Sequence, residues 1–583
     1  MMKRYFLAAT PIAAMLLLTG CMDDNYDLSN IDTTSEVKVN GLVLPVNVKP
    51  VTLSIDEEGG ITEEVDPATG KKIYAYTYDG DFSSDPLSID PFRVTAPVLT
   101  PEQIHVELTS AINTRAAIDE IHYTIREMKT DFDYVLDDID PAVSKVERLK
   151  TPKVVFRTHI QFPNVVTANS DKIVVKDMKV AFPVGMAASS NLGTYNASTG
   201  IVTINDYQLP ATGALDLVVT ATSLEIGKDV VDGSFTYEES ITIMDGGELL
   251  LTPSASGNLP DDFMLDADYT LSSFDVTAFS GAIEKPLDGM SIDPISLSDL
   301  PDFLTGDGTN IILSNPQLYL SLTNPASPYK VQAHTGLSFT PVRGNVKSDA
   351  IELPGGLTVG DNLPAGSRYN YALSPAGSSL VPVAQYADAE KIAYPGLGNV
   401  LAGNGLPDKL EVEFANPNAF GQQVTDFPLG TDIAGVKGDY LFRAPLALEE
   451  GSTIYYSGTK DDWDADDPKD LYVTELVITA TASSDVPLAL TVGAKILNSK
   501  NQEEGICTPA VLPALAKDQE ITFTIKAAEG TEINDIAALH YTATCVTNDE
   551  GAGEALSPDQ EVTLNNVRAK VTGRYLYVDD DND

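Results

Sequence analysis

The stretch that decides the fold is Glu520-Ile521-Thr522-Phe523-Thr524-Ile525, in which every second side chain is apolar. Successive side chains of a β-strand point to opposite faces, so this period of two predicts a strand with one buried and one solvated face. The same alternation recurs along the chain, at Val46 and Val48, at Met178, Val180 and Phe182, at Leu318, Leu320 and Leu322, and at Leu488, Leu490 and Val492. The sequence therefore predicts an all-β fold of antiparallel strands.

Short turns and a few short helices complete this pattern. Residues 196–200 form a turn-like stretch that ends in glycine, and a strand-like run follows it at once. The stretches 297–304 and 397–403 are candidates for single helical turns. Residues 118–128 have some helical character, but Ile121, Tyr123 and Ile125 alternate, so we predict a strand there.

A weak internal repeat suggests several β-sandwich modules in tandem. The pattern of an aliphatic residue, two polar or small residues and two further aliphatic residues begins at Val39, Val175 and Val473, with a looser copy at Leu313. This spacing suits sandwich modules that carry insertions, although a six-residue pattern also recurs by chance in β-rich chains. The predicted segments are a signal peptide (1–20), an acidic tether (21–32) and four modules (33–168, 169–300, 301–465 and 466–583).

The first residues have the layout of a secretory signal peptide. Lys3 and Arg4 precede an apolar run over 6–18, which is too short to span a bilayer as a mature helix. The run ends in Leu18-Thr19-Gly20-Cys21, which resembles the lipobox of bacterial lipoproteins. The resemblance implies cleavage before Cys21 and attachment of diacylglyceryl and palmitate-type acyl chains to that residue, which would anchor the protein to a membrane. The alternative is an ordinary signal peptide with a chance cysteine.

The residues after Cys21 are acidic, in the order Met22-Asp23-Asp24-Asn25-Tyr26-Asp27. This resembles the surface-export signal of Bacteroidetes-type lipoproteins, and residues 27–34 resemble the start of many uncharacterised lipoproteins of that group. The resemblance implies the outer membrane, and within it the cell surface. A solvated tether that only holds the body off the membrane is the alternative.

The charge of the chain excludes one class of partner. It has 85 acidic and 37 basic residues, which gives a net charge of −48. Such a chain repels phosphate backbones, so we expect no nucleic-acid partner, and its membrane contact is expected through lipid alone.

No catalytic constellation is visible. The histidines are scattered singly, as His105, His122, His159, His334 and His540, and none belongs to a HExxH pattern. There is no GxSxG nucleophile motif and no phosphate-binding glycine loop. We therefore expect a non-enzymatic protein, although so many carboxylates leave room for an unrecognised catalytic pair.

One acidic loop offers a candidate calcium site. Asp462, Asp464 and Asp466 stand at i, i+2 and i+4, as do the first oxygen ligands of a calcium loop. Asp467 replaces the expected glycine, and Val473 replaces the closing glutamate, so a solvated acidic loop is the alternative. No other cofactor is expected.

Aromatic side chains offer candidate glycan contacts. Trp463 lies in the acidic loop, and Tyr74, Tyr76 and Tyr78 share one face of a predicted strand. Aromatic rings stack on sugars, but tyrosine is also a good strand former, so packing in the core is the alternative.

Two cysteines remain besides Cys21. Cys507 and Cys545 both lie near strand-like segments of the last module. An exported protein can form a disulfide between them, and two buried free thiols are the alternative.

These features together favour a lipid-anchored protein of the cell envelope with an adhesion or glycan-binding role. A structural subunit of a fimbria-like or outer-membrane assembly is the second hypothesis. A glycan-degrading enzyme on a β scaffold is the third, and no motif supports it.

Overall fold

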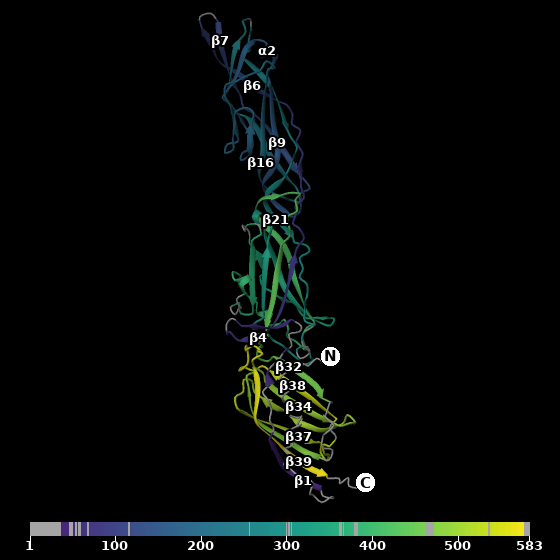
Figure 1. Cartoon of the computed structure of the whole chain (residues 1–583). Coiled ribbons are helices and arrows are strands. Elements are labelled where there is room, and N and C mark those ends of the chain that lie inside the picture. The colour runs from purple at the N-terminus through teal and green to yellow at the C-terminus, as the bar shows by residue number, and fades with distance from the viewer. Residues whose placement is uncertain are drawn as a thin grey trace, which may run out of the picture.

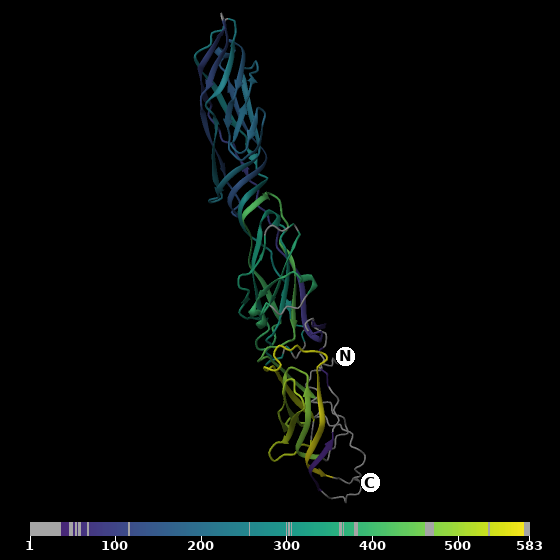
Figure 2. The same ribbon diagram turned by 90° about the vertical axis from the view of Figure 1, so that its left-hand side faces the viewer.

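The chain runs from one end of a long rod to the other and back again (Figures 1 and 2). The computed structural model describes residues 36–45, 51–52, 55, 60–66, 69–114, 117–255, 257–298, 300, 304, 306–360, 364, 366–377, 383–460, 471–534 and 537–576. These residues confirm the all-β prediction. Their helices are short, namely α2 (Asn164–Thr167) and the 3-10 turns Ser327–Tyr329, Ala384–Tyr386 and Pro395–Asn399.

The rod has three parts, which we call the tip, the shaft and the base. The tip contains β5 (Arg93–Val94), β6 (Glu102–Thr114), β7 (Ala117–Ile125), β8 (Met128–Leu136), β9 (Val143–Gln161), β10 (Ser170–Lys176), β11 (Met178–Ala181), β12 (Ala187–Ser190), β13 (Thr194–Asn196), β14 (Ile201–Ile204), β15 (Tyr207–Gln208), β16 (Ala214–Asp229), β17 (Phe235–Ile243), β18 (Gly247–Pro253), β19 (Asp262–Leu271), β20 (Phe274–Asp275) and β21 (Ala278–Pro286). The predicted strand over 118–128 corresponds to β7, as its alternation indicated, but the strand ends at Ile125 and Met128 begins β8.

The shaft and the base each combine early and late strands of the chain. The shaft contains β3 (Ile61–Val65), β4 (Lys72–Ser83), β22 (Ile295–Ser296), β23 (Gln317–Thr323), β24 (Gln332–Arg343), β25 (Val346–Lys347), β26 (Ile351–Glu352), β27 (Leu357–Val359), β28 (Arg368–Ser374), β29 (Glu390–Ala393), β30 (Lys409–Pro428) and β31 (Lys437–Pro445). The base contains β1 (Glu36–Pro45), β2 (Val51–Thr52), β32 (Thr453–Lys460), β33 (Leu471–Ser484), β34 (Ala489–Leu497), β35 (Glu503–Thr508), β36 (Ala510–Leu512), β37 (Gln519–Ala527), β38 (Ala538–Val546) and β39 (Glu561–Leu576).

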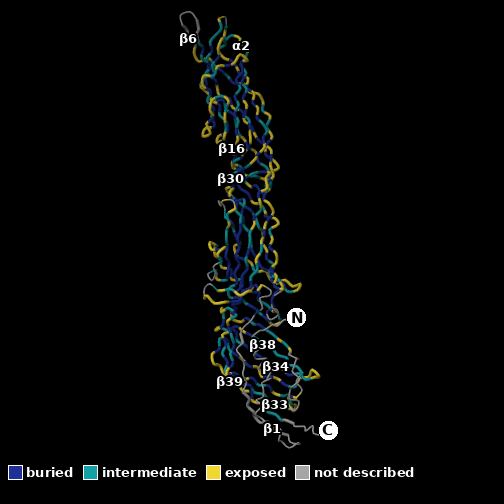
Figure 3. The backbone as a smooth tube through the Cα atoms, viewed as in Figure 1, coloured by how far each residue is buried: buried dark blue, intermediate teal, exposed yellow. Residues whose placement is uncertain are grey.

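The strand β37 shows why these residues form these elements. Its Ile521, Phe523 and Ile525 are buried, while Glu520 and Thr522 are exposed, as the period of two predicts. The buried sides of such strands join into one apolar cluster that extends through all three parts, and Figure 3 shows the buried residues along the inside of the rod.

The sheets do not follow the predicted module boundaries. The segment 33–168 holds strands of the base, of the shaft and of the tip, and its early strands pair with the end of the chain: β1 and β2 pair with β39, and β4 pairs with β31. The segment 169–300 ends inside the shaft, the segment 301–465 combines shaft strands with β32 of the base, and the segment 466–583 holds only part of the base. The tip is inserted into the shaft and the shaft into the base, an arrangement that a search for tandem repeats cannot detect.

One antiparallel sheet continues from the tip into the shaft. Within it, β21 pairs with β9 of the tip along one edge and with β30 of the shaft along the other. Lys285 of β21 strengthens this joint, because its Nζ lies 3.2 Å from Asp140 Oδ2 and donates to the carbonyl oxygen of Ser88. A sheet shared between two bodies restricts their bending more than a flexible linker would.

An ion pair between a buried arginine and a half-buried glutamate fixes the early hairpin of the shaft. Arg443 of β31 is almost fully buried, and its guanidinium bonds Glu64 of β3. Its Nη1 also donates to Gln317 Oε1 at 3.2 Å, and the hydroxyl of Tyr319 donates to the same oxygen at 2.7 Å. The edge strand β3 is therefore held to the shaft by charge as well as by pairing with β4.

We expect Arg443→Ala to lower the free energy of unfolding by about 3 kcal/mol, because it leaves Glu64 without its buried partner. Urea denaturation followed by tyrosine fluorescence checks this. Lys72→Ala on the same hairpin is the control, since Lys72 pairs with Glu63 in an exposed position and should leave the midpoint unchanged. Equal midpoints for Arg443→Ala and the unaltered protein would contradict the role of this ion pair.

Candidate functional site

The strands β6 and β7 lie at the end of the rod opposite β1 and β39 (Figure 1), and the sheet there has a polar face. The strand β19 alternates strictly, with Asp262, Met264, Asp266 and Asp268 exposed and the residues between them buried. Acidic side chains therefore alternate with core residues along one strand. We call this surface, with its neighbours on β6 and β9, the tip face.

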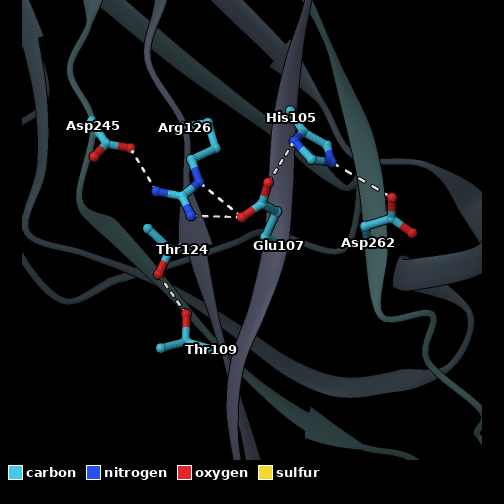
Figure 4. Close-up of polar contacts among 7 residues, drawn as sticks. All are labelled: His105, Glu107, Thr109, Thr124, Arg126, Asp245 and Asp262. Atoms are coloured by element: carbon cyan, nitrogen blue, oxygen red, sulfur yellow. Dashed lines mark hydrogen bonds and ion pairs between the residues drawn. The ribbon is translucent and has the colours of Figure 1, made fainter.

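The register with β6 brings like charges together. Glu107 stands opposite Asp262, His105 opposite Met264, and Gln103 opposite Asp266. Two carboxylates in direct opposition repel each other. His105 lies between them, with Nδ1 3.1 Å from Glu107 Oε1 and Nε2 3.5 Å from Asp262 Oδ2, as Figure 4 shows.

Arg126 holds Glu107 from the other side (Figure 4). Its Nε and Nη2 donate to Glu107 Oε2 at 3.0 and 2.6 Å, and its Nη1 donates to Asp245 Oδ1 at 3.3 Å. The hydrogen bonds from Arg126, ahead of its charge, lower the pKa of Glu107, and the same bonds raise the pKa of Arg126. Exposed ion pairs add little stability, so these contacts mainly orient the side chains.

A second histidine lies farther along the same face. His159 of β9 stands opposite Asp216 of β16 on one side and opposite Asp268 of β19 on the other. Its Nδ1 lies 2.9 Å from Asp216 Oδ1, to which Arg157 Nη2 also donates at 2.7 Å. Hydrogen bonding by His159, followed by that from Arg157, lowers the pKa of Asp216.

The tip face can therefore offer a partner several carboxylates, two imidazoles and an exposed thioether. Among the described residues, no group of three or more His, Cys, Asp or Glu side chains is arranged to hold a metal ion. The chemistry of the face suits recognition of a polar surface through hydrogen bonds and charge.

No helix within the described ranges is long and apolar enough to span a membrane.

Two of the three tyrosines proposed for glycan stacking lie in the core of the shaft. Tyr74 and Tyr76 are buried, and the hydroxyl of Tyr76 donates to the carbonyl oxygen of Ser296 at 2.7 Å. Tyr78 is partly buried against Tyr440, with ring centroids 6.4 Å apart. The faces of Tyr74 and Tyr76 are thus closed to a sugar, and the packing alternative holds for them.

The two late cysteines are free thiols and not a disulfide. Both are buried, and β34 lies between their strands. Cys545 stands opposite Leu490, while Ile506, the neighbour of Cys507, stands opposite Lys495. This register separates the cysteines by about four residues along β34, roughly 13 Å, in addition to two strand spacings. A disulfide needs Cα atoms within about 7 Å.

The remaining predicted site residues lie outside the described residues. These are the lipidation residue Cys21, the candidate calcium ligands Asp462, Asp464 and Asp466, and Trp463. The tip face was not predicted from the sequence. The alternating aspartates over 262–268 were a visible signal, but their neighbours come from β6 and β9, more than one hundred residues away.

The chain matches no protein-family model, and no curated protein matches it. Among solved structures it is similar to the crystal structure of a presumed secreted protein from Parabacteroides distasonis. The two share 15% sequence identity with a TM-score of 0.34, and the match covers 51% of this chain and 90% of that one.

We expect the native protein to be inert to thiol reagents at pH 8. Burial raises the pKa of Cys507 and of Cys545 to about 12, and only the thiolate reacts. A variant with Cys21→Ser should therefore give no colour with a chromogenic disulfide reagent when folded and two thiols per chain in denaturant. A count of zero in non-reducing denaturant would show a disulfide and contradict the register.

Proposed function

We propose that this chain is a lipid-anchored rod of the outer membrane that presents the tip face to a partner outside the cell, in a non-enzymatic adhesion role. One observation carries the proposal. The start of β1 and the end of β39 pair at one end of the rod, and the hairpin of β6 and β7 stands at the other (Figures 1 and 2).

The lipid anchor suits this geometry. The proposed lipidation site, Cys21, precedes Glu36 by only 15 residues, so lipid would attach the rod by its base. A chain of that length reaches at most about 50 Å. The tip would then be the part held farthest from the membrane.

The chemistry of the tip face supports a polar partner. Among the described residues, the side chain of Asp268 makes no ion pair or hydrogen bond, and that of Asp266 accepts only from the side-chain amide of Gln103. These carboxylates are not neutralised by lysine or arginine, so they are free to bind the hydroxyl groups of a glycan or the cationic side chains of a protein.

Surface exposure on intact cells tests the anchored orientation. Added protease should degrade the native protein, and Cys21→Ala should release the protein from the membrane fraction. Protection of the native protein until the outer membrane is broken would contradict an outward-facing rod and leave a periplasmic assembly as the better hypothesis.

Binding by the tip face needs a separate measurement. On a glycan array and a panel of host-matrix proteins, we expect a ligand whose binding falls at least tenfold in Asp266→Asn/Asp268→Asn. The control is Asp131→Asn/Asp133→Asn, which makes the same charge change on the exposed side of β8, in the other sheet of the tip. Equal losses in both variants would attribute the binding to overall charge and overturn the assignment to the tip face.

A further inference from the structure

We propose that the rod stays in one piece, with its tip still held to the strand that follows the anchor, after a single backbone cut at either joint. The proposal rests on the path of the chain and on the main-chain hydrogen bonds at the joints. It needs no lipid and no ligand, so it can fail or hold independently of the proposed function.

The joint between base and shaft is crossed twice. The chain first crosses between β2, which pairs with β39 of the base, and β3, which pairs with β4 of the shaft. It crosses back between β31 and β32. A cut in one crossing therefore leaves the other covalent connection intact.

Main-chain hydrogen bonds join the returning crossing to both bodies. The Leu446 amide donates to the carbonyl oxygen of Tyr74 at 2.9 Å, and the Leu556 amide donates to that of Leu446 at 3.0 Å. The Tyr74 amide in turn donates to the carbonyl oxygen of Leu556 at 2.9 Å. These three residues belong to the outgoing shaft strand, the returning crossing and the base, so the joint is a small three-way backbone network.

A second set of contacts lies beside this network. Asn310 and Thr453 exchange amide-to-carbonyl bonds of 2.7 Å in both directions. The fully buried hydroxyl of Ser452 accepts from the Ile312 amide at 3.1 Å. Buried backbone bonds of this kind are costly to break without replacement.

The chain also crosses the joint between shaft and tip twice. The chain enters the tip between β4 and β5 and leaves it between β21 and β22. Leu87 of the entering segment and Ile433 of the shaft exchange amide-to-carbonyl bonds of 2.8 and 3.0 Å. The leaving side is held by β21, which pairs with both bodies. Both crossings of this joint are therefore hydrogen-bonded to the shaft.

The anchor-side strand remains attached by pairing alone if the chain is cut between β2 and β3. β1 pairs with β39 from Glu36 opposite Leu576 to Pro45 opposite Arg568, and Val51 adds a further pair with Val562. A strand with this many ladder bonds is held without a covalent link, as in complexes that form by strand addition.

Recognition sequences for a site-specific protease test the proposal in the chain that begins at residue 22. One variant carries the sequence between Ile55 and Gly60, in the outgoing crossing. A second carries it after Gly451, in the returning crossing, where residues 450 and 451 are exposed and an added Cβ on Gly451 would meet no atom within 4 Å. A third variant carries both. Denaturing gels confirm cleavage, and size-exclusion chromatography in native buffer and in rising urea reports association.

After either single cut, we expect the two fragments to elute together at the position of the uncut variant. The doubly cut protein should separate into fragments at a lower urea concentration than either singly cut protein. Separation in native buffer after a single cut would overturn the proposal. So would identical urea dependence of the singly and doubly cut proteins, because the second crossing would then contribute nothing.

Discussion

The pairing of β1 with β39 is the constraint on which the rest of the structure depends. An antiparallel pair joins the first and last described strands of the chain. Because both strands lie in the base, the chain between them has to run out to the tip and back again. The base is therefore completed only when the last strand is in place, and in the sequence the tip is inserted into the shaft and the shaft into the base.

Asn40 and Leu42 flank a register shift in β1, and such a bulge bends an edge strand away from pairing with other chains. The bulge therefore disfavours edge-to-edge pairing of β1 with another chain.

The nested path explains how a long molecule can be stiff without helices. Each joint has two chain crossings, and main-chain hydrogen bonds run between the neighbouring bodies at both. The joint between tip and shaft also shares the strand β21. The apolar cluster passes through the joints as well. Within the tip, the inner sides of the strands supply the core, and the outer side of β19 is left free to carry aspartates that stability does not need. The same alternation thus provides both the packing and the candidate recognition surface.

The sequence predicted the class of fold well because strand alternation is a local property. Ile521, Phe523 and Ile525 needed no partner to be identified as one buried face, and the strand over 118–128 followed from Ile121, Tyr123 and Ile125. Connectivity is not local: nothing in Val39 or Val43 indicates that the partner strand lies more than five hundred residues away. For the same reason the four predicted modules differ from the three nested bodies, and the tip face, assembled from β6, β9 and β19, was not foreseen. The tyrosines of β4 show the opposite limit. Alternation placed them on one face, but β4 is buried on both faces there, since Ile73 and Ala75 are buried as well as Tyr74 and Tyr76.

The most direct test of this account is the distance between the two ends of the described chain. Spin labels at Lys38→Cys and Arg574→Cys, in a Cys21→Ser background, occupy directly opposed positions of β1 and β39. We expect no labelling of Cys507 and Cys545, because both are buried. Electron paramagnetic resonance should show strong dipolar broadening for this pair. Labels at Lys38→Cys and Thr124→Cys, at the base and on the tip hairpin, should show none. Broadening in the second pair, or its absence in the first, would contradict the outward-and-back path from which the proposed function starts.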